Sequence, residues 1–231
     1  MSSFILKIIA CICMFCDHFG DFCFNDTTIL NYIGRLAFTI FAFQIVQGYI
    51  HTSNIKKYIF RLTLFAFISQ IPYMVFCYSI FGKLFEVNVI FTLLFGLFTI
   101  LIYDKYNKFV GFCSCFALGV LAQVLHFDYG FYGVLIVFVF YLLRAQKLYM
   151  ALVFIFSVIC KYYFTIIKYG IPFSYIFWGN KYSILMYSTC ISIIPVLLYN
   201  EKKGKDVKYL FYIFYPLHLL ILGLLKMYWI K

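Results

Sequence analysis

An acid and an imidazole stand side by side at Asp17 and His18, inside the apolar stretch "LKIIACICMFCDHFG" of residues 6–20. If this stretch is a membrane helix, both side chains lie in the hydrocarbon or at its edge, where ionisable groups are costly and usually functional. A neutral imidazole can accept a proton near pH 7, and burial favours the neutral form. We therefore expect His18 to have a functional role.

A lysine precedes this histidine by eleven residues, at Lys7. Eleven residues are close to three helical turns, so Lys7 and His18 should share one helix face, roughly 16 Å apart along the axis. A cation near the helix end and an imidazole deeper on the same face outline a path for an elongated anionic cofactor. Taken alone, Lys7 is better explained as a side chain that extends to the cytoplasmic interface.

Arg35 enters the next apolar stretch, "NYIGRLAFTIFAFQIVQGYIHT", at a depth comparable to that of Asp17. Opposite charges at one depth should pair, because each alone is costly in hydrocarbon. Asp17 and His18 project about 100° apart around a helix, so we expect Asp17 to bind Arg35 rather than to orient His18. Gly34 would permit close backbone approach. Arg35 serves equally well as an interfacial anchor.

The amino-acid composition indicates that these stretches are membrane helices. The 231 residues are 65% hydrophobic and 24% aromatic, and only 12% are charged. A soluble domain is about half apolar and a quarter charged, so the surrounding medium must be lipid. The net charge of +11 fits cationic loops near anionic lipid, and no basic and aromatic recognition module indicates a nucleic acid partner. The nine cysteines lack metal-ligand spacing, so no metal site is predicted.

Apolar runs of suitable length predict an all-α polytopic membrane protein with about nine transmembrane helices in a single domain, residues 1–231. The first run has no cleavage pattern behind it, so it is expected to be retained as a helix. The predicted spans are 4–23, 33–50, 59–80, 88–103, 109–125, 129–143, 148–167, 182–199 and 208–228.

Loop charges predict the orientation. Twelve of the nineteen Lys and Arg residues fall on one side when the N-terminus is placed in the cytoplasm, including those of "HTSNIKKY", "DKYNK", "RAQK" and "NEKKGKDVK". The positive-inside rule then gives an N-in, C-out topology in a bacterial inner or cytoplasmic membrane. Lys56, Lys57 and Arg61 lie near this inner face, where they could meet the phosphates of an anionic cofactor.

Other polar and aromatic residues are ambiguous. His51 and His126 lie at helix ends and are expected to be structural. His218 follows a proline inside the last span and is either a packing residue or a member of the site. The outer loop 168–181, "KYGIPFSYIFWGNK", is either an interfacial aromatic belt or a lid that receives the acceptor substrate through Trp178.

These stretches together resemble the TraX family, whose founding members acetylate the N-terminus of conjugative pilin. The matching segments are "LKIIACICMFCDHFG", "IGRLAFTIFAFQIVQGYIHTSN", "KKYIFRLTLFAFISQIPY", "NVIFTLLFGL", "DYGFYGVLIVFVFYL" and "YIFYPLHLLIL". They span nearly the whole chain in the family's order. The family looks like a branch of a wider transmembrane acyltransferase superfamily, several members of which carry a Lys or Arg ten intervening residues before a His, as Lys7 and His18 do.

The resemblance implies acyl transfer from cytoplasmic acyl-CoA, and acetyl-CoA is the expected donor. The acceptor is expected to be a peptide or a glycan at or beyond the outer face. His18 would be the base, although an acyl-histidine intermediate is the alternative. Arg35 and Asn31 would donate to the oxyanion, or merely hold Asp17. Two positions depart from the pattern of relatives: Thr39 stands where a proline is expected, and Gln47 stands where many relatives place an acid before "GY". If that acid binds the acceptor amine in relatives, the acceptor of this chain differs.

Two other classes of protein compete with an acyltransferase. A transporter would use Asp17, His18 and Arg35 as a proton or ion relay, but no internal repeat or matched pair of broken helices favours it. A membrane peptidase would need a metal-type histidine cluster or a clear Cys/His motif, and neither is present in the sequence.

Overall fold

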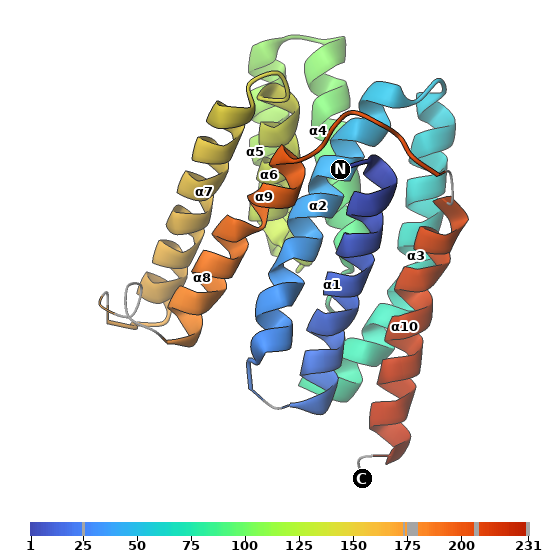
Figure 1. Ribbon diagram of the computed structural model, residues 1–231, viewed down its shortest axis with the longest axis vertical. Helices are drawn as coiled ribbons and strands as arrows, with labels where there is room; N and C mark the ends of the chain where they lie inside the picture. The colour runs from blue at the N-terminus through green and yellow to red at the C-terminus, as the bar shows by residue number, and fades with distance from the viewer. Residues whose placement is uncertain (25, 173, 175–179, 206–207, 230–231) are drawn as a thin grey trace. The chain divides into compact units, whose positions relative to one another are not determined.

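The computed structural model describes residues 1–24, 26–172, 174, 180–205 and 208–229 (Figure 1). Within these ranges the chain forms ten α-helices, and a single isolated β-bridge joins Val87 and Phe127. The helices are α1 (Ser3–Cys23), α2 (Ile29–His51), α3 (Ile55–Phe81), α4 (Val89–Lys105), α5 (Lys108–Val124), α6 (Gly130–Leu142), α7 (Lys147–Lys168), α8 (Lys181–Ile191), α9 (Ile193–Leu197) and α10 (Lys208–Trp229).

The prediction of nine helical segments fits this structure, except that the eighth segment is divided into α8 and α9. Pro195 explains the division, because it has no N–H to donate to the carbonyl of Ile191. The Ser192 hydroxyl donates instead to the carbonyl oxygen of Thr189 at 2.6 Å, which satisfies a backbone group at the break.

In the described part of the chain, five helices are long and apolar enough to cross a membrane: α1, α2, α3, α7 and the 211–228 part of α10. An α-helix satisfies its own backbone hydrogen bonds, which is what a span through hydrocarbon requires. Large apolar side chains also remain exposed along these helices, for example Ile12, Phe67 and Phe164. The chain is therefore a polytopic helical membrane protein.

The chain divides into two compact units. The first consists of Met1–Phe41 and Leu143–Asp206, and the second of Ala42–Leu142 and Val207–Lys231. The boundary falls inside α2, so the N-terminal part of that helix belongs to the first unit. The expectation of one functional domain over residues 1–231 stays a prediction.

The first unit contains α1, the beginning of α2, and α7 to α9. Its fully buried side chains include Leu6, Ile40, Phe154 and Val158. The start of α1 is held by the segment before α10, because the N–H groups of the first helical turn donate to the carbonyls of residues 202 and 203 at 2.8 and 3.1 Å. This places two segments far apart in sequence side by side at one end of the unit.

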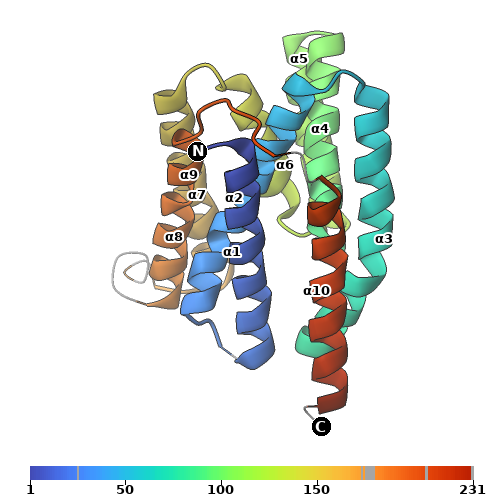
Figure 2. The same cartoon turned by 45° about the vertical axis from the view of Figure 1, so that its right-hand side comes forward.

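The second unit contains α3 to α6, α10 and the end of α2. Helices α3 and α10 run side by side in Figures 1 and 2, and the rings of Phe65 and Tyr212 stack with centroids 4.4 Å apart. Helices α4, α5 and α6 pack on one another around buried residues such as Leu97 and Phe138. The carboxylate of Asp104 joins α4 to α6 by accepting a hydrogen bond from the Tyr141 hydroxyl at 2.7 Å.

Candidate functional site

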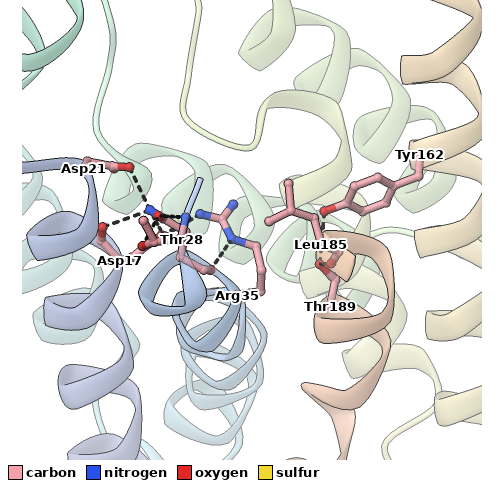
Figure 3. A network of polar contacts seen from close by, with 8 residues as sticks. Asp17, Asp21, Thr28, Arg35, Tyr162, Leu185 and Thr189 are labelled. Carbon is pink, nitrogen blue, oxygen red and sulfur yellow. Dashed lines mark hydrogen bonds and ion pairs between the residues drawn. The ribbon is translucent and has the colours of Figure 1, made fainter. Parts of the chain in front are cut away.

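A pair of opposite charges joins α1 to α2 in the first unit. The Nη2 atom of Arg35 lies 2.7 Å from each carboxylate oxygen of Asp17 (Figure 3). Asp17 lies six residues before the end of α1 at Cys23, and Arg35 lies six residues after the start of α2 at Ile29. Both are therefore about 9 Å from the end of their helix, and the pairing expected from equal depth is present.

The two helices approach closely where the pair forms. A Cβ atom added at Gly34 would lie 2.4 Å from the Cβ and Cγ atoms of Asp17. Only glycine leaves room for the carboxylate at this position. The side chains of Asp17 and Arg35 are 15% and 26% exposed, so the pair is shielded from solvent on most sides.

Asn31 connects a second acid to this pair. Its Nδ2 atom donates to the Asp21 carboxylate at 2.7 Å, to the Asp17 carboxylate at 3.2 Å and to the Asp17 carbonyl at 3.1 Å. Its Oδ1 atom accepts from the N–H and hydroxyl of Thr28 at 2.9 and 3.0 Å. The Arg35 Nε–H donates to the Asn31 carbonyl at 3.2 Å. Asn31 is 4% exposed, and its amide hydrogens hold the acids together, which is one of the two roles expected for it.

Asp21 and Thr28 were not singled out as site residues by the sequence. Asp21 follows Asp17 by four residues, so the two acids share a face of α1. That spacing is a local signal for the shared site. Thr28 lies just before α2, where a hydroxyl commonly caps the helix, and the cap alone gives no sign of a partner.

His18 and Lys7 both lie on the continuous helix α1 and are half-buried. Because the helix is unbroken between them, they share a face, and their separation along the axis is about 16 Å. Asp17 directs its carboxylate to Arg35 and Asn31, on a different side of α1 from His18. The roles of His18 as base and Lys7 as donor-binding residue stay predictions.

The other candidates for binding an anionic cofactor belong to the second unit. Lys56 and Lys57 are exposed in the first turn of α3, and Arg61 follows one turn later. The Nε atom of Arg61 is buried and has no hydrogen-bond partner among the described residues. Gln47 is half-buried on the part of α2 that belongs to this unit. Among the described residues no group of three His, Cys, Asp or Glu side chains is arranged to hold a metal ion.

His218 is buried in α10, also in the second unit, and is 5% exposed. Its Nδ1 atom lies 2.7 Å from the carbonyl oxygen of Phe214 and therefore donates to it. The imidazole also stacks on the Phe214 ring, with centroids 4.8 Å apart. These contacts fit the packing role, and membership of the site stays a prediction for His218. Trp178, the candidate acceptor-binding residue of the 168–181 loop, lies outside the described residues.

Two charged residues of the first unit pair near the end of α1 and the start of α8. Lys181 at the start of α8 lies 3.4 Å from the Asp26 carboxylate in the α1–α2 loop. The Thr27 N–H donates to the same carboxylate at 2.8 Å. The Thr27 N–H and the Lys181 ammonium lower the pKa of the Asp26 carboxyl below its usual value, so it stays ionised at neutral pH.

The chain is a polytopic helical membrane protein with a shielded Arg–Asp pair and a histidine on its first helix. In integral membrane proteins of this kind, ionisable groups within the helices usually belong to a functional site. Comparison with known proteins identifies its family. A family model described as TraX protein matches residues 2–226. The chain is also 30% identical, over an alignment 257 positions long that covers 98% of the chain and 96% of the relative, to the protein of Dichelobacter nodosus named "Probable fimbrial assembly protein FimC, serogroup H1".

This chain belongs to the TraX family, and the resemblance noted in the sequence is confirmed. The family is associated with pilin acetylation. No solved structure matches the chain at a significant level.

Proposed function

We propose that this protein is a membrane acyltransferase that moves an acetyl group from acetyl-CoA to an amine or hydroxyl of an acceptor at the outer membrane face. One observation carries the proposal: in a TraX-family chain, α1 holds Lys7 and His18 on one face while Asp17 is engaged by Arg35. Asp17 is thereby held on a different side of α1 from His18. An imidazole is suited to accept a proton near pH 7.

The cationic residues fit an anionic donor. Arg61 buries an Nε–H that lacks a hydrogen-bond partner among the described residues, and an unsatisfied buried donor is costly unless an acceptor reaches it. Lys56 and Lys57 lie one turn earlier on the same helix, and Lys7 lies on α1. We propose that Arg61, Lys56 and Lys57 bind phosphates of acetyl-CoA, the guanidinium as a directional donor and the lysines as point charges. Lys7 of the first unit is proposed separately as a donor-binding point charge.

In the proposed reaction, His18 removes the proton from the acceptor nitrogen or oxygen while that atom forms a bond to the acetyl carbonyl carbon. The carbon–sulfur bond then breaks, and His18 returns the proton to the departing CoA thiolate. The carbonyl oxygen carries negative charge between these steps and needs a hydrogen-bond donor or a positive charge beside it. The positive charge of Arg35 is one such group.

The proposed orientation is N-in and C-out, in the inner or cytoplasmic membrane of a bacterium. The positive-inside bias supports it, and it places Lys7 at the side where acetyl-CoA is made. A reporter fused after Lys205 should then read cytoplasmic, and one fused at Lys231 should read external. Two reporters on the same side would contradict the orientation.

The acceptor is proposed to be a peptide amine of a fimbrial subunit, with a glycan as the other candidate. The relative in Dichelobacter nodosus is named as a fimbrial assembly protein, and the family association with pilin points the same way. Gln47, Trp178 and His218 are the residues proposed to contact the acceptor. Alanine at Trp178 should then weaken use of the acceptor while sparing acetyl-CoA binding.

The decisive experiment compares wild-type protein with His18→Ala in detergent or lipid nanodiscs. Wild-type protein should bind acetyl-CoA more weakly at high salt and should transfer labelled acetyl to the acceptor. His18→Ala should keep donor binding and lose transfer by roughly 10²–10⁴-fold, the scale of one general base. Full transfer by His18→Ala would remove the proposed base. Proton uptake into vesicles that depends on His18, without acetyl transfer, would support a transporter instead.

A further inference from the structure

Tyr162 lies at the same level of the first unit as the Asp17–Arg35 pair. It lies six residues before the end of α7 at Lys168, as Asp17 does before the end of α1. Its side chain is buried, with 8% exposed. In Figure 3 the side chains of Tyr162 and Arg35 extend from α7 and α2 into one region beside Leu185.

The hydrogen-bond geometry fixes the direction of the phenolic hydrogen. The Tyr162 Oη atom lies 3.3 Å from the Thr189 Oγ1 atom. The Thr189 hydroxyl donates its own hydrogen to the carbonyl oxygen of Leu185 at 2.7 Å. Since Thr189 has a single hydrogen, Tyr162 is the donor in the longer contact.

This contact is weak. Hydrogen bonds between hydroxyl oxygens are usually 2.5–3.0 Å long, and 3.3 Å exceeds that range. An acceptor that carries negative charge forms a shorter and stronger bond. An oxyanion placed between α2 and α7 would therefore replace Thr189 as the acceptor of the Tyr162 hydrogen bond.

The neighbouring donors at this level are engaged in stronger contacts. The amide hydrogens of Asn31 are directed to Asp17 and Asp21 at distances down to 2.7 Å. The Nη2 and Nε atoms of Arg35 donate to Asp17 and to the Asn31 carbonyl. Tyr162 therefore replaces Asn31, which the sequence suggested, as the neutral donor suited to this role.

We infer that the Tyr162 hydroxyl donates a hydrogen bond to the acetyl carbonyl oxygen as negative charge develops there, with the positive charge of Arg35 close by. The inference rests on the proposed acetyl transfer. Tyr162 keeps its proton throughout. The bond strengthens when the acceptor attacks and weakens when the carbonyl re-forms and the CoA thiolate departs, so the interaction lowers the barrier rather than tightening substrate binding.

The test compares Tyr162→Phe with Thr189→Val and with Tyr163→Phe, a variant at the exposed neighbouring tyrosine. Tyr162→Phe removes the hydroxyl and keeps the buried ring. Tyr162→Phe should lower kcat by a factor on the order of 10², which is the effect of losing one oxyanion donor, and should change KM for acetyl-CoA little. Thr189→Val and Tyr163→Phe should change kcat by about twofold or less, since the oxyanion donor remains in both.

A purely structural role gives a different result. Tyr162→Phe and Thr189→Val break the same contact between α7 and α8, so equal losses of activity and of thermal stability would overturn the inference. Full turnover by Tyr162→Phe would also overturn it. If wild-type protein transfers acetyl and depends on His18 while Tyr162→Phe is unimpaired, the proposed function stands and only the role of Tyr162 fails. Absence of transfer by wild-type protein would refute both.

Discussion

Removing Asp17 should destabilise the first unit, because it leaves the Arg35 guanidinium in a mostly shielded position without its closest counter-charge. Breaking a buried ion pair on one side costs about 3–5 kcal/mol, whereas exposed pairs contribute about 0.2–1 kcal/mol. Side-chain exposures of 15% and 26% and two contacts of 2.7 Å place this pair nearer the buried limit. The partial exposure of Arg35 lets water solvate some of the remaining charge. We therefore expect a loss of about 2–3 kcal/mol for Asp17→Ala.

For a chain of this length, each kcal/mol corresponds to about 2–4 °C in Tm, so the expected decrease is roughly 5–10 °C. Cys11 and Cys13 are buried on the same helix as Asp17, with 7% and 5% exposed. Cys23 and Cys113 are exposed and react in the folded state. The increase above this background in the signal of a thiol-reactive fluorescent dye, added to the purified protein in detergent, therefore reports unfolding. The same assay applies to every variant considered below.

The double variant Asp17→Ala/Arg35→Met provides the control. If the cost comes from an unpaired charge, removing that charge should recover at least half of the lost stability. A Tm within 2 °C of wild type for Asp17→Ala would refute the argument, since the pair would then contribute no more than a surface ion pair. The argument would also be refuted if the double variant lost more stability than the two single variants lose together.

Three further outcomes follow from the structure. Gly34→Ala should cost about 1–3 kcal/mol in the same dye assay, because the added Cβ overlaps Asp17; unchanged stability would mean that the helices can separate freely. The lowered pKa of Asp26 predicts a contribution to stability that is present above about pH 4 and is lost as the pH falls through the lowered pKa. Asp26→Asn breaks the pairing with Lys181 and should therefore make Tm depend less on pH in this acid range. Lys7→Gln should raise KM for acetyl-CoA more than it lowers kcat in steady-state kinetics, and the difference from wild type should shrink at high salt.

The helices were largely predictable because a membrane span imposes a length and a hydropathy that local sequence reveals. The break between α8 and α9 was missed, although Pro195 is the visible cause, because the apolar run continues across it. The division into two units was not predictable, since it depends on which helices pack together. The boundary inside α2 has no turn or linker to mark it.

The Asp17–Arg35 pair was predictable because the cost of a lone charge in hydrocarbon leaves few alternatives for two opposite charges at one depth. The link through Asn31 to Asp21 depends on how the α1–α2 connection brings the helix ends together, and only the i, i+4 spacing of the two acids indicated it. Tyr162 had no local signal at all. It is one of two adjacent tyrosines in an aromatic helix, and only the placement of α7 distinguishes them.

The first unit is discontinuous in the chain, and this has a consequence for its biosynthesis. About a hundred residues of the second unit leave the ribosome between Phe41 and Leu143, so α1 and α2 reach the bilayer well before α7 and α8. A lone Asp or Arg near a helix centre adds about 2.5–3.5 kcal/mol to the free energy of translocon-mediated insertion. Asp17 and Arg35 can neutralise each other within the first helical hairpin, so both can enter lipid as a pair without waiting for the later helices.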